Sequence, residues 1–127
     1  MRAEEIMNRR LEVVDPELTV LEVIEKIVNK RIRSVIVRLK ERDYGVITVR
    51  DIVYKCLVKG IDPEGLKAYE IASKPLVTVE KGTTVEEILA IMEKSKIGNV
   101  FVREGDKIVG SITLMDIMTG YLIGRLL

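Results

Sequence analysis

The 127-residue chain contains the same stretch of sequence twice. A shift of 65 residues aligns residues 3–62 with residues 68–127 without a gap, and 18 of the 60 aligned positions are identical. A unit of about 60 residues buries too little apolar surface to be stable alone, so the copies are expected to pack together with pseudo-twofold symmetry. The repeat therefore predicts two copies of one supersecondary unit, 1–61 and 62–127, in one compact module.

Each copy contains the pattern of an amphipathic helix. Apolar residues recur at i, i+3, i+4 and i+7 over residues 20–28, with Val28 as the last apolar position, and again over residues 85–92. Thr-x-x-Glu precedes both, at 19–22 and 84–87. In this capping box the hydroxyl and the carboxylate satisfy free backbone N–H groups at the helix start. Both segments are predicted to be the first long helix of their copy.

β-branched runs and a closing helix complete each copy. The strands are predicted at residues 11–14, 34–39 and 44–48 in the first copy and at 76–79, 99–103 and 107–113 in the second. Polar turns at 40–43 and 104–107 make the last two strands of each copy a hairpin. A final helix follows, with apolar faces within 52–57 and 117–122. The order is β-α-β-β-α, an α/β unit of the α+β kind.

The connection between the copies is also predicted to be ordered. Asp62-Pro63-Glu64 has the form of an N-cap, a proline at the first helical position and an acidic first turn. Residues 63–73 are therefore predicted to be helical, with a short helix at residues 2–8 as the counterpart.

Composition argues against several classes of function. The formal net charge is only +1, and the aromatic residues are four Tyr and one Phe, so no nucleic-acid partner is indicated. One cysteine, Cys56, and no His exclude an internal disulfide and a Cys/His metal cluster, and Cys56 is expected to be a buried apolar residue in a reducing compartment. No 18-residue apolar run or signal peptide occurs, so a cytoplasmic protein without a membrane partner is expected. The absence of Gln, Trp and His is typical of thermophiles.

One motif occurs at the same register in both copies, where the second strand meets the last helix. It is Gly-h-x-Thr-x-x-Asp, formed by Gly45, Thr48 and Asp51 and by Gly110, Thr113 and Asp116. Thr-x-x-Asp at a helix start is also a capping box, so these side chains could serve the helix alone. A helix N-terminus is nevertheless a favourable anion site, and glycine lets backbone approach a ligand closely. Duplication of the whole set favours a binding role.

Motif and element order together resemble the CBS (cystathionine-β-synthase) repeat family over essentially the whole chain. The resemblance implies a stand-alone CBS pair, of archaeal or thermophilic type, that binds AMP, ADP, ATP or another adenosyl compound such as S-adenosylmethionine in the cleft between the repeats. Asp51 and Asp116 would accept hydrogen bonds from the ribose hydroxyls, and Thr48 and Thr113 would donate to the α-phosphate. A carboxylate suits a vicinal diol because it has two acceptor oxygens and no donor.

The resemblance also implies where adenine would lie, against the turn into the first long strand of each copy and the extended piece beside it. These residues are Ile32, Arg33, Ser34, Ile97, Gly98 and Asn99, with Leu11, Val13, Leu76 and Thr78 alongside. Arg50 precedes Asp51 where Met115 stands in the second motif, so charge favours phosphate binding at the first copy. Lys30 and Arg31 are equally explained as charges that complement a helix C-terminus. Arg33 in place of Gly98 alters the adenine contact in the first copy.

Three functions are weighed on these features. The preferred one is an adenine-nucleotide-binding regulatory module that senses energy charge, with the nucleotide as its ligand and no catalytic cofactor. The serious alternative is a structural module that forms homodimers through its terminal helices and binds no nucleotide. An enzyme is not indicated, because no His, phosphate loop or metal-ligand spacing is present. A homodimer is expected in either case, and the regulated target is expected to be a separate protein.

Overall fold

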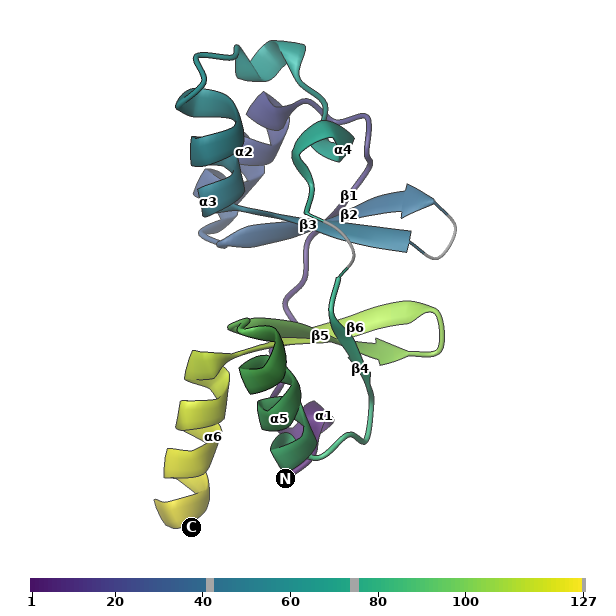
Figure 1. The fold of residues 1–127 in the computed structure, drawn as a ribbon, viewed down its shortest axis with the longest axis vertical. Helices are drawn as coiled ribbons and strands as arrows, with labels where there is room; N and C mark the ends of the chain where they lie inside the picture. Colours follow the sequence, from purple (N-terminus) through teal and green to yellow (C-terminus); the bar gives the residue numbers. More distant parts are fainter. Residues whose placement is uncertain (41–42, 74–75, 127) are drawn as a thin grey trace. The chain divides into compact units, whose positions relative to one another are not determined.

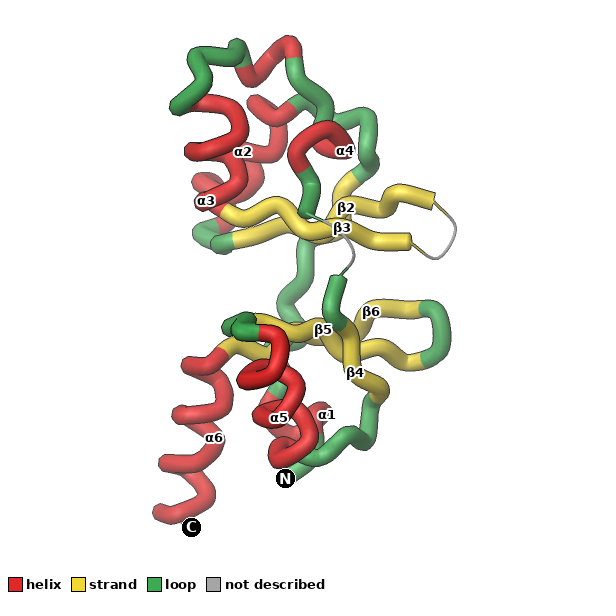
Figure 2. Tube along the Cα trace, viewed as in Figure 1, coloured by secondary structure: helices red, strands yellow, loops and turns green. Residues whose placement is uncertain are grey.

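The computed structural model describes residues 1–40, 43–73 and 76–126. The chain forms two compact units: the Asp51 unit, residues Glu12–Leu76, and the Asp116 unit, residues Met1–Leu11 with Val77–Leu127. In each unit a three-stranded sheet carries its helices on one face (Figures 1 and 2). The predicted α+β fold and the order β-α-β-β-α are confirmed.

The Asp51 unit has strand order β1-β2-β3, with β1 parallel and β3 antiparallel to the central strand. Its elements are β1 (Val13–Val14), α2 (Val20–Lys30), β2 (Ser34–Lys40), β3 (Asp43–Thr48), α3 (Val49–Ile52), the π-helical turn η1 (Val53–Leu57), the 3₁₀ turn η2 (Pro63–Gly65) and α4 (Ala68–Ile71). Ser34 pairs with Thr48 at the end where β3 runs into α3. The register therefore places the start of β2 beside the start of the last helix.

The Asp116 unit repeats this arrangement with strand order β4-β5-β6. Its elements are α1 (Ala3–Ile6), β4 (Thr78–Glu80), α5 (Val85–Ser95), β5 (Asn99–Glu104), β6 (Lys107–Thr113) and α6 (Leu114–Leu126). Asn99 pairs with Thr113, as Ser34 does with Thr48. No helix in the described ranges has the length and apolar character needed to cross a bilayer.

The units in space differ from the halves 1–61 and 62–127, because each repeat packs with the segment that precedes the other repeat in sequence. Asn8 forms a two-bond backbone bridge with Ser111 of β6, with N···O distances of 2.8 and 3.0 Å. Ser73 forms the same bridge with Val46 of β3, at 2.8 and 3.0 Å. Residues 1–11 therefore belong with the second repeat, and residues 62–76 belong with the first.

The motif glycines make these bridges possible. A Cβ at Gly45 would lie 3.0 Å from Ala72 Cβ and 3.1 Å from Ser73 O. A Cβ at Gly110 would lie 2.8 Å from Cγ and 3.0 Å from Cβ of Met7. The close approach expected at these glycines is thus made by the chain itself, since residues 7–8 and 72–73 occupy the space beside the two strands.

The apolar pattern predicted for the first helices is largely confirmed. Val20, Val23 and Ile27 are buried and pack with alternate residues of β2 in the core of the Asp51 unit. Val28, at the end of the same stripe, is 66% exposed although its neighbour Ile27 is buried. In the Asp116 unit Ile88 and Met92 of α5 are buried against β5, whereas Leu89 of the predicted stripe is 42% exposed.

The capping boxes of the first helices are present to different degrees. Thr19 and Glu22 form the complete box, with the Glu22 carboxylate accepting from the Thr19 N–H and the Thr19 hydroxyl accepting from the Glu22 N–H. At Thr84 the hydroxyl accepts from the Glu87 N–H, and the described residues show no reciprocal bond. The second box is therefore half of the predicted one.

The connection between the repeats is less helical than predicted. Only η2 and α4 are helical within residues 63–73, and α1 is shorter than residues 2–8. Leu66 O accepts from the Val20 N–H and Leu18 O accepts from the Ala68 N–H, which holds Leu66 and Lys67 extended along the start of α2. The predicted turn at 40–43 falls partly outside the described residues.

The last helix of the Asp51 unit differs from a regular α-helix, since η1 follows α3 directly. Ile52 and Cys56 point into the core, whereas Val53 is 36% and Leu57 50% exposed, so only half of the predicted apolar face is buried. The burial predicted for Cys56 is confirmed: its thiol donates to Ile61 O at 3.3 Å, and burial raises the thiol pKa. Such a thiol is poorly nucleophilic.

We expect Lys96→Gly to stabilise the chain by about 0.5–1 kcal/mol. Lys96 ends α5 in the left-handed conformation, with φ of 55°, which glycine adopts without steric cost. Urea unfolding at neutral pH measures the change. Ala90→Gly, at an exposed position inside α5, introduces the same residue and should destabilise by about 1 kcal/mol. Equal signs for the two substitutions would contradict the conformational argument.

Candidate functional site

The first candidate site is the junction of β3 and α3, where Thr48 and Asp51 form a complete capping box. Asp51 Oδ2 accepts from the Thr48 N–H at 2.9 Å and from the Thr48 hydroxyl at 3.1 Å. The Thr48 hydroxyl in turn accepts from the Asp51 N–H at 3.2 Å. The side chains that the sequence predicts for ribose and phosphate therefore also hold the start of the helix together.

The junction of β6 and α6 has the same geometry. Asp116 Oδ2 accepts from the Thr113 N–H at 2.8 Å and from the Thr113 hydroxyl at 3.0 Å, and the Asp116 N–H donates to the Thr113 hydroxyl at 3.2 Å. In both junctions the threonine proton is directed at the aspartate. The threonine hydroxyl would have to rotate before it could donate to a phosphate. The second oxygen of each aspartate, Oδ1, takes no part in the capping box.

The structure brings the start of each central strand to its junction. Arg33 O accepts from the Val49 N–H at 3.3 Å, and Gly98 O accepts from the Leu114 N–H at 3.2 Å. Ser34 and Asn99 lie opposite the two motif threonines. This part of the predicted adenine surface therefore adjoins the Thr/Asp pair within each unit.

The remaining predicted adenine residues are placed less favourably. Ile32 and Ile97 pack against the cores of their own units, which leaves them only partly exposed. Val13 and Thr78 lie in β1 and β4, opposite the third residue of the central strand. Leu11 and Leu76 belong to the Asp116 unit and the Asp51 unit respectively, so neither lies in the same unit as the extended strand that follows it.

Two residues at the Asp51 junction were not predicted from the sequence. Asp51 Oδ1 accepts from the Ser73 hydroxyl at 3.1 Å and forms an ion pair with Lys55 Nζ at 3.1 Å. Lys55 Nζ also donates to Ile71 O at 3.0 Å and to the Ser73 hydroxyl at 3.1 Å. The spacing of four residues between Asp51 and Lys55 is a recognisable signal in the sequence. The contribution of Ser73, 22 residues from Asp51, is visible only in the fold.

These contacts set the charge state of Asp51. Burial alone would raise the pKa of its carboxyl, but the bonds from Thr48, Lys55 and Ser73 outweigh that effect and hold the pKa below its ordinary value. The Asp51 side chain is 13% exposed and that of Lys55 is 41% exposed. The Asp51 carboxylate is thus largely shielded from solvent, whereas the Lys55 ammonium group is open to it.

The Asp116 junction lacks these partners. The positions equivalent to Lys55 and Ser73 are Gly120 and Asn8, and the Asn8 amide oxygen accepts from the Arg10 N–H at 2.9 Å. A Cβ at Gly120 would lie 2.8 Å from Ile6 Cγ2, so α1 fills the space next to α6. In the described part of the chain no donor reaches Asp116 Oδ1. The buried amide oxygen of Asn99 also has no partner there.

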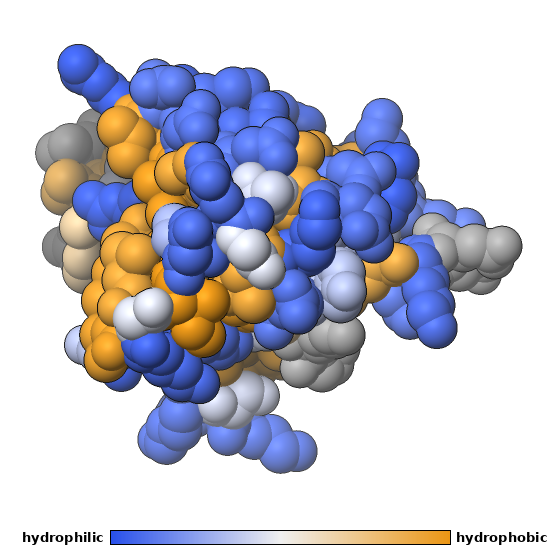
Figure 3. All heavy atoms as spheres, turned by 90° about the horizontal axis from the view of Figure 1, so that it is seen from above, coloured by the Kyte–Doolittle hydropathy of each residue, from blue (hydrophilic) through white to orange (hydrophobic). Residues whose placement is uncertain are grey.

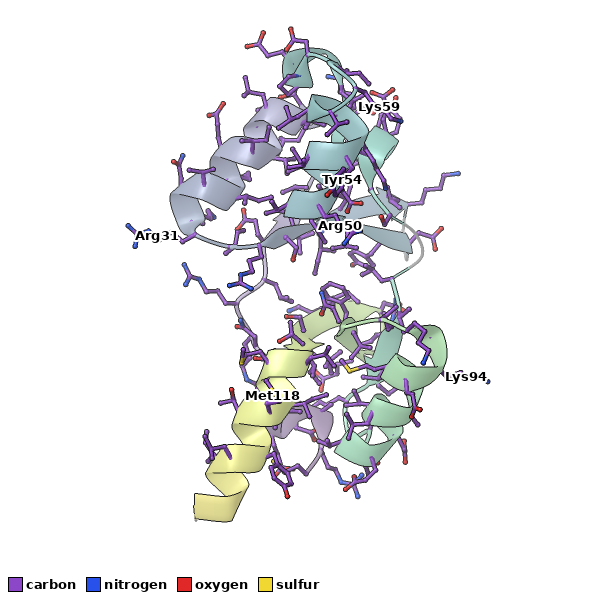
Figure 4. All side chains as sticks on the ribbon, turned by 60° about the vertical axis from the view of Figure 1, so that its left-hand side comes forward. Arg31, Arg50, Tyr54, Lys59, Lys94 and Met118 are labelled. Atoms are coloured by element: carbon purple, nitrogen blue, oxygen red, sulfur yellow. The ribbon has the colours of Figure 1, made fainter. Side chains whose placement is uncertain are left out.

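The basic residues near the Asp51 junction are exposed. Arg50 stacks over the Tyr54 ring, with its guanidinium carbon 5.5 Å from the ring centroid (Figure 4). Arg33 is exposed, and Arg31 ends α2 in the left-handed conformation, with φ of 53°. Arg31 points away from the unit at the end of that helix (Figure 4). Among the described residues no group of three His, Cys, Asp or Glu side chains could hold a metal ion.

Comparison with known proteins identifies the same repeats. The family model for the CBS domain matches twice, over residues 3–57 and 68–122. An uncharacterized protein from Methanocaldococcus jannaschii is 34% identical over 109 residues, covering 84% of this chain and 59% of that protein. The chain thus spans about three fifths of the length of this relative.

Solved structures agree in fold. A hexameric CBS-CP12 protein from bloom-forming cyanobacteria matches with a TM-score of 0.84 and 32% identity, covering 93% of this chain and 66% of that one. An uncharacterized conserved protein from Pyrococcus horikoshii matches with a TM-score of 0.83 and 25% identity, covering 94% of this chain and 91% of that one.

We expect Asp51→Asn to lower the free energy of unfolding by about 1 kcal/mol at pH 7, a value discounted for the exposure of Lys55. Because the pKa of Asp51 is lowered in the folded state, its contribution is complete above the unfolded value near 4 and is lost as pH falls through the folded value. Urea unfolding of both proteins between about pH 7 and pH 2 should therefore show the two stability curves converging below about pH 4. Glu25→Gln, on the exposed face of α2, should leave the curve parallel to that of the parent. A constant difference for Asp51→Asn would contradict the ion-pair explanation.

Proposed function

Because the chain belongs to the CBS domain family, with copies over residues 3–57 and 68–122, we propose that it is a regulatory module whose ligand is an adenine nucleotide. CBS domain pairs are generally regulatory rather than catalytic and often bind adenosyl compounds. AMP, ADP and ATP are the candidates that the ribose and phosphate groups suggest, with S-adenosylmethionine as the alternative adenosyl ligand.

The observation that carries this proposal is the duplicated strand–helix junction. Each junction presents a carboxylate, a threonine hydroxyl and the first turn of a helix at one point, beside the start of the central strand. A ribose diol needs paired acceptors, and a phosphate needs N–H or hydroxyl donors. Both sets are present within a few residues of each other in each unit.

The capping bonds are compatible with this role. They use Oδ2 of each aspartate, so a ribose bound through Oδ1 would leave the start of the helix intact. The same bonds hold the carboxylate in one orientation before the ligand arrives, which reduces the conformational entropy lost on binding. Capping and binding therefore support each other.

A second candidate function, homodimerisation, rests on the apolar surface of the last helices. On α6, Leu114, Met115, Met118, Tyr121, Leu122 and Ile123 are between 51% and 63% exposed. In the Asp51 unit, apolar side chains gather on the side where α3 lies, as Figure 3 shows looking onto that unit. A helix that is apolar around most of its circumference is normally buried against another surface. A second copy of the chain, related by a twofold axis, would bury the α6 surfaces of both copies against each other.

For nucleotide binding, we expect Asp51→Ala with Asp116→Ala to weaken the affinity for the adenine ligand at least about tenfold. Each occupied site loses hydrogen bonds to a charged acceptor worth about 1.5–3 kcal/mol. The affinity is measured by calorimetric titration of nucleotide-free protein with AMP, ADP, ATP and S-adenosylmethionine. GMP is the comparison for base specificity. Glu22→Ala removes the capping carboxylate of α2, which stands to Thr19 as Asp51 stands to Thr48, and should leave the affinity unchanged. Unaltered binding in the aspartate variant would refute the ribose assignment.

For dimerisation, we expect Met118→Glu with Leu122→Glu to convert the dimer to a monomer, because two carboxylates would be buried without partners. Sedimentation equilibrium measures the mass. Leu89→Glu places the same carboxylate at an exposed apolar position of α5, outside α6, and should leave the dimer intact. A monomeric parent protein would argue against this second function.

A further inference from the structure

The two aspartates of the repeated motif differ in how many acceptor positions remain for a ligand. A carboxylate offers about four lone-pair positions. At Asp51 all four are used: the Thr48 N–H and hydroxyl bind Oδ2, and the Ser73 hydroxyl and Lys55 ammonium bind Oδ1. At Asp116 the Thr113 N–H and hydroxyl take the two positions on Oδ2. No donor from the described ranges reaches Asp116 Oδ1.

Lys55 and Ser73, whose equivalents are Gly120 and Asn8, account for this difference, and Lys55 contributes the charge. Lys55 lies one turn after Asp51 and is anchored by three acceptors, Asp51 Oδ1, Ile71 O and the Ser73 hydroxyl. At the same place in the Asp116 unit there is no side chain, and Ile6, the equivalent of Ile71, packs over Gly120. A ribose hydroxyl at Asp51 would have to displace an ammonium ion from a partly buried carboxylate. At Asp116 it would meet an open acceptor.

Asn99 adds an independent observation that points the same way. Its side-chain oxygen is buried and has no hydrogen-bond partner within the described residues, and Asn99 lies opposite Thr113 in the sheet. Buried acceptors are normally satisfied, because an unpaired one costs free energy. Because this oxygen is buried, a ligand donor at the junction would become its partner only after the Asn99 side chain rotates toward it. The equivalent residue in the Asp51 unit is Ser34.

We infer that the two sites are unequal: the Asp116 junction binds the nucleotide, and Lys55 closes the Asp51 junction by occupying its carboxylate. This inference rests on the proposed function, which it narrows to one nucleotide per chain. It reverses the preference for the first copy that its extra positive charge suggested. Arg50 and Arg33 add charge near the Asp51 junction, but they do not free the carboxylate that the ribose requires.

The test is the number of nucleotides bound per chain, measured by calorimetry with the tightest of AMP, ADP, ATP and S-adenosylmethionine on protein shown to be folded by circular dichroism. We expect one equivalent for the parent, none for Asp116→Asn at concentrations that saturate the parent, and two for Lys55→Met. Lys55→Met with Asp116→Asn should bind one equivalent again, now at the opened junction. Lys59→Met removes the same charge from an exposed position one turn later and should keep one equivalent (Figure 4).

The outcomes separate this inference from the proposed function. Two equivalents in the parent, full binding by Asp116→Asn, or a single equivalent in Lys55→Met would overturn the inference and leave nucleotide binding intact. Weaker binding in Lys55→Met would show that the ammonium contacts the ligand, and would also overturn it. No binding by the parent to any compound of the panel would overturn both.

Discussion

The architecture depends on a close backbone contact, the two-bond bridge that each second hairpin strand makes with the segment preceding the other repeat. The bridge favours glycine at positions 45 and 110, because a Cβ there would press on Ala72 or Met7 at 3.0 Å or less and these segments would have to shift. It brings residues 1–11 to the second repeat and residues 62–76 to the first. Each unit is therefore completed by a segment that lies beside the other repeat in sequence.

The same bridge determines the environment of the candidate sites. Pairing of Ser73 with Val46 places the Ser73 hydroxyl and Ile71 O where Lys55 can reach both. Pairing of Asn8 with Ser111 places Ile6 against Gly120. Two junctions with identical motif residues thus acquire different neighbours, because these neighbours come from segments in which the repeats have diverged. The chemistry of a duplicated motif can differ between copies although the motif itself does not.

Helix capping and ligand binding are compatible in this fold because they use different oxygens of the same carboxylate. Oδ2 completes the capping box in both junctions, and Oδ1 is the oxygen whose partners differ between them. A Thr-x-x-Asp pattern read from sequence is therefore evidence for a helix start in either case. Only the contacts of the second oxygen distinguish an occupied carboxylate from an available one.

The amino-acid pattern alone predicted the repeat, the order of the elements and the strands to within about two residues, since periodicity and β-branched runs depend on neighbours close in the chain. It also placed Thr48, Asp51, Thr113 and Asp116 at helix starts. It overestimated the helix at 63–73, because backbone pairing with residues 18–20 holds Leu66 and Lys67 extended between two short helical turns. Tertiary structure alone decided which segment completes each unit, why the motif glycines are favoured and that Ser73 reaches Asp51. These features depend on contacts between residues far apart in the chain, which local patterns do not encode.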